Sequence, residues 1–206
     1  MTPFYMYLSL MQTIRGRLDI IETLKTTPEA KFLKAEAAAF QGRKVIEATA
    51  FACLVATENG LKTVPRDAKG QWNAEAILKS LKAKGISALP DPSQMIEPSP
   101  ELKLQGANFT IAPMPERRLS ATDIIEMYRR FHSWLHELNP YTAGNHEAFY
   151  AHHSKDLWRD LERLSMFLDR HIICIKSNGF FCALRDKVDF QTKLIGFGLD
   201  AGPSNG

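Results

Sequence analysis

The chain has 206 residues, of which 45% are hydrophobic and 24% are charged, and its formal net charge is +3. That length and composition are typical of one globular domain, and they exclude a chain that is disordered throughout. A net charge so close to zero excludes a protein that coats nucleic acid non-specifically, although it allows a local basic site.

Cysteine usage and the N-terminal segment indicate the compartment. The three cysteines, Cys53, Cys174 and Cys182, are odd in number and far apart. They predict reduced thiols, with neither a disulfide framework nor a Cys-x2-Cys metal knuckle. Residues 1–14 are fairly apolar, but they lack the basic region of a signal peptide and are too short to span a bilayer. We therefore expect a cytoplasmic protein with no membrane partner.

Helical periodicity and capping signals predict five helices. Their approximate ranges are 4–25, 29–58, 73–84, 120–139 and 146–170. The first helix has an apolar stripe at three- and four-residue steps, made of Met11, Ile14, Leu18 and Ile21. Ser120 and Asp123 have the spacing of a capping box at the start of the fourth helix, and Asn145 is the expected cap of the fifth. Trp134 has no periodic partner on the fourth helix, which predicts an exposed interface residue or a base-stacking platform.

Two further segments lack helical periodicity. Residues 86–116 contain six prolines and predict a long, partly extended connection within one domain. Apolar runs at 172–175 and 180–184, separated by Asn178-Gly179, predict a β-hairpin on a tight turn, and 188–197 is a candidate third strand. We therefore predict a mainly α fold. It consists of one domain over 1–197, with four or five antiparallel helices in a bundle, a small C-terminal hairpin over about 171–197, and a disordered tail at 198–206.

The end of the fourth helix carries the residues best suited to chemistry. Arg129, Arg130, His132 and His136 lie within eight residues. In an ideal helix Arg129 and His136 lie nearly above one another with His132 between them, whereas Arg130 points about 120° away from His136. Imidazoles that titrate near neutral pH and a permanent guanidinium are what cleavage of a phosphodiester requires. The alternative is a solvated helix face, which is the common meaning of such spacing.

Other readings of these residues stay open. His132 and His136 have the i, i+4 spacing that can chelate zinc, with a third ligand from one of the histidines at positions 146, 152 and 153. No Glu-x-x-His pattern accompanies the two histidines and the sequence has no Gly-rich phosphate loop, so we expect neither a metal nor a cofactor. Arg43 and Glu47 have i, i+4 spacing and are read as a structural ion pair on the second helix.

The segment 128–141 resembles the Arg-x4–6-His motif of the HEPN superfamily of helical nucleotide-binding and ribonuclease domains. Residues 135–141 read Leu-His-Glu-Leu-Asn-Pro-Tyr and are similar to the branch whose motif ends in Leu-His-x-x-Asn-Pro-aromatic. Residues 40–47, Phe-Gln-Gly-Arg-Lys-Val-Ile-Glu, Trp158 on the last helix and the hairpin after His171 also resemble that branch.

The resemblance implies a metal-independent endoribonuclease in which two protomers place their motifs side by side. His136 is then the motif histidine, and Arg130 or Arg129 is the motif arginine, with five or six intervening residues. Tyr128 favours Arg130, but the usual polar residue after the motif arginine is replaced by Phe131. Asn139 and His132 are the expected substrate-binding residues.

The predicted function is an RNA-cleaving toxin or anti-phage (abortive infection) effector that acts as a homodimer. The alternative is a non-catalytic HEPN-like module that binds and regulates a partner protein. The expected partners are RNA, a second copy of the chain, and an antitoxin or defence-system protein. Trp134 and Tyr141 are the candidate anchors of a dimer in which the fourth helices face each other, because aromatic residues are enriched in interface cores.

Overall fold

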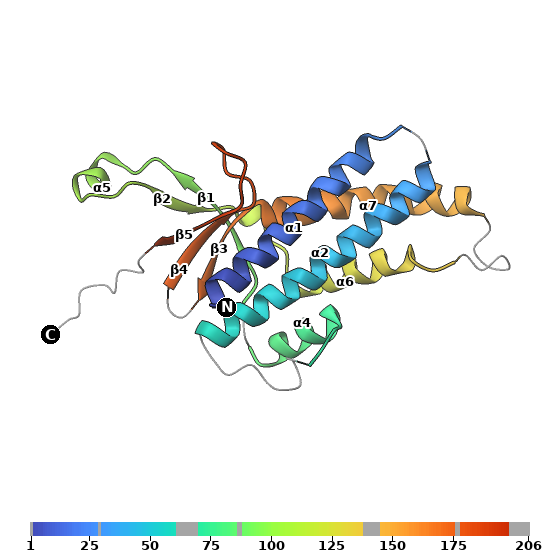
Figure 1. Cartoon of the computed structure of the whole chain (residues 1–206), viewed down its shortest axis with the longest axis horizontal. Helices are drawn as coiled ribbons and strands as arrows, with labels where there is room; N and C mark the ends of the chain where they lie inside the picture. The colour runs from blue at the N-terminus through green and yellow to red at the C-terminus, as the bar shows by residue number, and fades with distance from the viewer. Residues whose placement is uncertain are drawn as a thin grey trace.

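The computed structural model describes residues 2–28, 30–60, 70–85, 88–137, 145–175 and 178–197. These residues form a mainly helical protein with a small antiparallel sheet, which confirms the predicted class (Figure 1). The α-helices are α1 (Pro3–Thr26), α2 (Lys31–Gly60), α4 (Ala74–Ala83), α5 (Pro100–Leu104), α6 (Ala121–Ser133) and α7 (His146–Asp169), with a 3₁₀ turn η1 (Pro115–Arg117). The strands are β1 (Asp91–Ile96), β2 (Thr110–Pro113), β3 (Arg170–Ile175), β4 (Asn178–Ala183) and β5 (Lys193–Phe197).

The long helices α1 and α2 lie side by side, and α6 and α7 pack against α2 (Figure 1). The predicted apolar stripe of α1 is buried. α2 is central because it is rich in alanine, and small side chains let neighbouring helices approach closely. Its fully buried alanines are Ala35, Ala38, Ala39, Ala50 and Ala52.

Gly42 is a point of close approach between α2 and two neighbouring helices. A Cβ atom at this position would lie 2.5 Å from Cδ2 of Leu161 on α7 and 2.9 Å from Cε2 of Phe131 on α6. Glycine therefore allows side chains of two other helices to cover the α2 backbone. This packing fixes the position of the next residue, Arg43, relative to α6.

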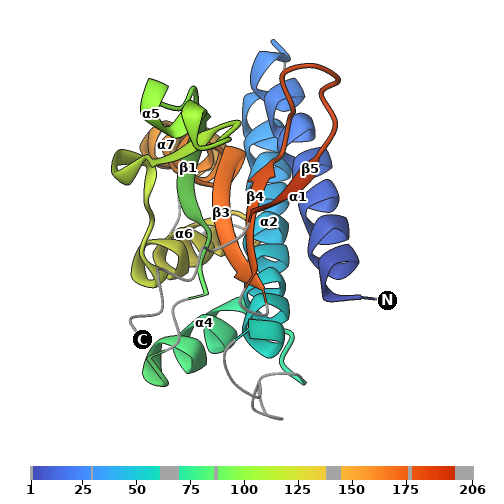
Figure 2. The same ribbon diagram turned by 90° about the vertical axis from the view of Figure 1, so that its left-hand side faces the viewer.

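The sheet has the strand order β2-β1-β3-β4-β5, and all its pairs are antiparallel. It lies at one end of the helices, and the β1–α5–β2 segment projects away from them (Figures 1 and 2). The proline-rich segment, predicted to be an extended connection, supplies β1 and β2. Its prolines are compatible with strands, because Pro92 is the second residue of β1 and Pro113 ends the edge strand β2.

The predicted C-terminal hairpin exists, but its turn was placed wrongly. Asn178 pairs with Ile175 and Gly179 with Cys174, so both turn candidates belong to β4, and the connection falls on residues 176–177, outside the described residues. A Cβ atom on Gly179 would lie 2.2 Å from the ring of Phe197 on β5. The glycine is therefore needed for this close approach across the sheet and not for a turn.

The capping predictions are confirmed at α6 and α7. The Ser120 hydroxyl accepts from the Asp123 N–H while the Asp123 carboxylate accepts from the Ser120 N–H, which completes the capping box. The Asn145 side chain accepts from the Ala148 N–H at 2.9 Å. However, α6 ends at Ser133, six residues earlier than predicted. No helix within the described residues is long and apolar enough to cross a membrane.

Candidate functional site

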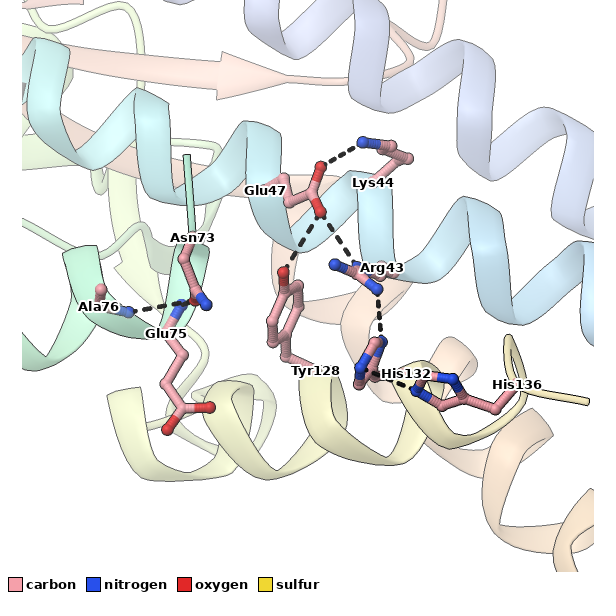
Figure 3. Close-up of polar contacts among 9 residues, drawn as sticks. All are labelled: Arg43, Lys44, Glu47, Asn73, Glu75, Ala76, Tyr128, His132 and His136. Carbon is pink, nitrogen blue, oxygen red and sulfur yellow. Dashed lines mark hydrogen bonds and ion pairs between the residues drawn. The ribbon is translucent and has the colours of Figure 1, made fainter. Parts of the chain in front are cut away.

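His132 at the end of α6, His136 just after that helix and Arg43 of α2 form a chain of polar contacts (Figure 3). Nη1 of Arg43 lies 2.5 Å from Nδ1 of His132, and Nε2 of His132 lies 3.0 Å from Nε2 of His136. Both imidazoles are exposed, and Arg43 is about a quarter exposed. The chain of contacts therefore lies at the surface, where a ligand can reach it.

The chemistry of the three groups fixes the protons along this chain. A guanidinium can only donate, so Nδ1 of His132 accepts from Arg43 and carries no proton. Neutral His132 then carries its proton on Nε2 and donates it to Nε2 of His136. His136 accepts on Nε2 and has its own proton on Nδ1. In this arrangement both imidazoles are neutral.

Arg43 is oriented by Glu47 and Tyr128. Its Nε donates to Oε1 of Glu47 at 3.1 Å, and its Cζ lies 5.1 Å from the centroid of the Tyr128 ring. The Tyr128 hydroxyl donates to the same carboxylate at 3.3 Å, and Lys44 Nζ donates to the other oxygen at 2.6 Å. Glu47 is only 13% exposed, so a largely buried carboxylate holds the more exposed guanidinium in place.

The surroundings lower the pKa of His132 below its ordinary value. Partial burial is the first cause, followed by the positive charge of Arg43 and by His136. Each of these disfavours the imidazolium form. His132 therefore stays neutral at pH values where an ordinary histidine begins to take up a proton.

The two predicted motif arginines point to other partners. Arg129 makes a two-point contact with Glu75 of α4, with Nε at 3.0 Å and Nη2 at 2.5 Å from the carboxylate oxygens. The hydrogen bonds from Arg129 and from Lys79 lower the pKa of Glu75 to about 2. Arg130 Nε donates to Oδ2 of Asp160 on α7 at 2.6 Å. Among the described contacts, neither arginine joins His132 or His136.

Trp134 is only 3% exposed, so the prediction of an exposed platform at this position is wrong. It caps the end of α6, and its ring lies 4.9 Å from Phe149 and 5.8 Å from Phe32, measured between centroids. Trp134 follows Phe131 by three residues and Met127 by seven, and both are fully buried, so it continues the buried face of α6. The predicted residues Asn139 and Tyr141 lie outside the described residues.

The other histidines near α6 lie in ring contacts. His146 stacks on Phe32 with centroids 4.3 Å apart, and His153 lies 4.4 Å from Phe149 and 4.6 Å from His152. Across the part of the chain that the structure describes, no group of three or more His, Cys, Asp or Glu residues could hold a metal ion.

Sequence reasoning missed Arg43 as a member of the site. Its pairing with Glu47 was predicted correctly, but the contact with His132 joins residues 89 positions apart in the chain. The only signal pointing there was the resemblance of residues 40–47 to one HEPN branch. Comparison with known protein families, with curated proteins and with solved structures found no match to this chain.

Proposed function

We propose that this protein is a metal-independent endoribonuclease of the HEPN type, acting as a homodimer in the role of a cytoplasmic toxin or anti-phage effector. One observation carries the proposal: two exposed imidazoles and a guanidinium lie in hydrogen-bond contact at the surface, with a carboxylate orienting the guanidinium. That set supplies the three groups that RNA cleavage requires without a metal.

The reaction begins with attack of a ribose 2′-hydroxyl on the adjacent phosphorus. A base takes the hydroxyl proton, an acid protonates the leaving 5′-oxygen, and a cation stabilises the phosphorane. The products are a 2′,3′-cyclic phosphate and a 5′-hydroxyl. DNA is not cleaved because it has no 2′-hydroxyl.

The contacts suggest a role for each residue. Arg43 binds the phosphate, and in doing so it releases Nδ1 of His132, whose lone pair it occupies in the free protein. His132 then acts as the base, because its lowered pKa keeps it neutral. His136 acts as the acid in its protonated form, in which its Nε2 no longer accepts from His132 and the hydrogen bond between the two rings is broken.

Arg129 and Arg130 have structural partners, so the proposal gives the motif arginine's role to Arg43. A homodimer remains part of the proposal because it would bring two such sets together. Trp134 does not support the contact, since it is already buried within its own protomer. The alternative function is a non-catalytic module that regulates a partner. It is favoured by the ion pairs of Arg129 with Glu75 and of Arg130 with Asp160, because these pairs occupy both arginines of the motif.

The test is incubation of the purified protein with a mixed RNA pool in EDTA. We expect cleavage that leaves 2′,3′-cyclic phosphates, and a rate lowered by roughly 10²–10⁴-fold in His136→Ala. Arg43→Ala should lower the rate by about 10²–10³-fold, as loss of a transition-state donor does. His152→Ala on α7 is the matched control and should keep the wild-type rate.

Three outcomes distinguish the alternatives. Cleavage that needs an added divalent ion, or that continues at the wild-type rate in His136→Ala, contradicts the mechanism. A large loss of cleavage rate in Arg129→Ala with no loss in Arg43→Ala indicates that Arg129 of α6, and not Arg43, is the motif arginine. A protein that binds RNA but never cleaves it supports the non-catalytic module. Light scattering at micromolar concentration tests the dimer, and a monomer contradicts it.

A further inference from the structure

A second feature of α2 lies next to the Arg43–His132–His136 contacts and takes no part in them. It is an open groove of about 490 Å³ formed by side chains that precede Arg43 on α2 together with Leu135, which precedes His136. The residues that line it are Leu33, Glu36, Ala37, Phe40, Gln41 and Leu135. We call this the Phe40 groove.

The floor of the Phe40 groove is apolar and exposed. Leu33 is 63% exposed and Phe40 is 43% exposed, although both are large hydrophobic side chains on a helix with a well-buried opposite face. Positions 33, 37 and 40 follow helical spacing and therefore share one side of α2. An aromatic ring left half open at the surface beside cationic groups is the arrangement on which nucleobases stack.

The position of the groove matches that of the proposed reaction. Phe40 precedes Arg43 by three residues, which is a rise of about 4.5 Å along the helix. α2 and α6 run in opposite directions (Figure 3), so the residues that precede Arg43 on α2 lie toward the end of α6, where Leu135 lines the groove and His136 follows it. A base stacked on Phe40 would therefore belong to a nucleotide next to the phosphate held by Arg43.

Two polar side chains that line the groove, Gln41 and Glu36, differ in hydrogen-bonding character. Nη1 of Arg17 donates to the Gln41 amide oxygen at 2.7 Å, which leaves the Gln41 amide nitrogen as a donor. Glu36 is a pure acceptor, and within the described residues it has no hydrogen bond or ion pair. A free carboxylate repels RNA phosphates and accepts from a ligand group that donates.

Guanine matches this pattern among the four RNA bases. Its Watson–Crick edge carries two adjacent N–H donors beside a carbonyl acceptor, whereas adenine, cytosine and uracil each lack such a pair of donors. We propose that the Phe40 groove is a subsite for a guanine of single-stranded RNA, stacked on Phe40 and selected by Glu36 and Gln41. This inference rests on the proposed function for its substrate class, RNA.

The test measures binding and not cleavage, so it is independent of the nuclease reaction. The probes are fluorescently labelled 2′-O-methyl oligouridines with one central position occupied by G, A, C or U, because they lack the attacking hydroxyl. Fluorescence anisotropy should show the tightest binding for the G probe. Phe40→Ala should weaken binding of every probe by about tenfold or more, as loss of one stacked base does.

Two further variants separate stacking from selection. Phe40→Leu keeps an apolar side chain without an aromatic face and should bind nearly as weakly as Phe40→Ala. Glu36→Gln should abolish the preference for G while leaving the affinity for the other probes unchanged or slightly higher. The matched controls are Leu104→Ala on the projecting segment and Glu162→Gln on the exposed face of α7, and both should bind as wild type does.

Each remaining outcome contradicts a distinct statement. Wild-type protein that binds no probe, or binds all four equally, overturns the guanine subsite, as does Phe40→Ala with wild-type affinity. If Phe40→Ala instead changes the oligomeric state by light scattering while binding is unchanged, the groove is an interface between copies. If the expected binding pattern is found but the protein does not cleave RNA, the guanine subsite is supported and the proposed nuclease activity is contradicted. If Phe40→Ala and Glu36→Gln both cleave RNA with the wild-type rate and base preference, the nuclease is supported and the guanine subsite is contradicted.

Discussion

The hydroxyl oxygen of Tyr7 lies 2.8 Å from Nε2 of His171, and both side chains are fully buried. Tyr7 belongs to α1 and His171 to β3, so this hydrogen bond joins the first helix to the sheet. Nδ1 of His171 lies 3.0 Å from the Leu168 carbonyl oxygen, which can only accept. His171 is therefore neutral, with its proton on Nδ1, and Nε2 accepts from the Tyr7 hydroxyl.

This pair predicts a loss of stability in acid. Burial lowers the pKa of His171 to about 4, compared with roughly 6.5 in the unfolded chain. The folded state therefore disfavours the proton, and the contribution of the neutral ring is complete above pH ~6.5. As the pH falls from ~6.5 to ~4, the free energy of unfolding should decrease by about 1.4 kcal/mol per pH unit. Urea unfolding at several pH values measures this slope.

His171→Gln is the variant that checks the assignment. Glutamine can hydrogen-bond but does not titrate, so the slope between pH ~6.5 and ~4 should become flatter by about one proton. Tyr7→Phe should lower stability by about 1–3 kcal/mol, because it leaves Nε2 of His171 buried without a donor. An unchanged slope in His171→Gln would show that other groups cause the acid sensitivity.

Arg130 is expected to matter for stability more than for catalysis. Asp160 is completely buried, and its Oδ1 has no hydrogen-bond partner, although Nη2 of Arg159 lies 3.8 Å away. Arg130 donates to Oδ2 at 2.6 Å and is therefore the main group that compensates the charge. Arg130→Ala should destabilise the fold by about 1–3 kcal/mol, a value reduced because Arg130 itself is 41% exposed. Asp160→Leu together with Arg130→Met should recover most of the loss, because no buried charge remains. A double-mutant cycle in urea measures the coupling, and additive losses would contradict it.

Two glycines in helices should respond in opposite directions to alanine. Gly42→Ala places a Cβ atom 2.5 Å from Leu161 and 2.9 Å from Phe131, so it should destabilise the protein by roughly 1–3 kcal/mol. Gly16 on α1 has no atom within 4 Å of a built Cβ. Gly16→Ala should therefore stabilise the protein by about 0.5–1 kcal/mol through helix propensity. Thermal unfolding of both variants compares them, and equal shifts would contradict the packing argument.

The elements whose signals are local were predictable from the sequence. The stripe on α1, the capping box at Ser120 and the cap at Asn145 each depend on residues within a few positions of one another, and all three are confirmed. The sequence missed β1, which gains hydrogen bonds from the distant strand β3, and β2, an edge strand whose pairing depends on β1. β1 pairs with β3 through Asp91 and Pro92, some eighty positions away from Ile172 and His171.

The candidate site shows the same division. The two histidines were singled out because they are four residues apart on one helix. Helical spacing also favoured Arg129 as their neighbour, but Glu75 on α4 is the partner that it meets. Which arginine reaches His132 depends on the packing of α6 against α2, and that packing depends on Gly42, a residue with no chemical signal of its own.

The last prediction concerns the pH dependence of RNA cleavage. If His132 acts as the base, only its neutral form is active, so the rate should fall on the acidic side as His132 takes up a proton. Its pKa is lowered by partial burial, by Arg43 and by His136, so the acidic limb of kcat/KM should lie below pH ~6.5. Arg43→Met removes the positive charge but not the burial, and it should move the limb part of the way back toward pH ~6.5 while lowering the rate. NMR titration of the His132 ring in both proteins gives the same shift without relying on activity. A His132 that titrates at or above pH ~6.5 in the wild type would contradict its assignment as the base and leave His136 as the remaining candidate.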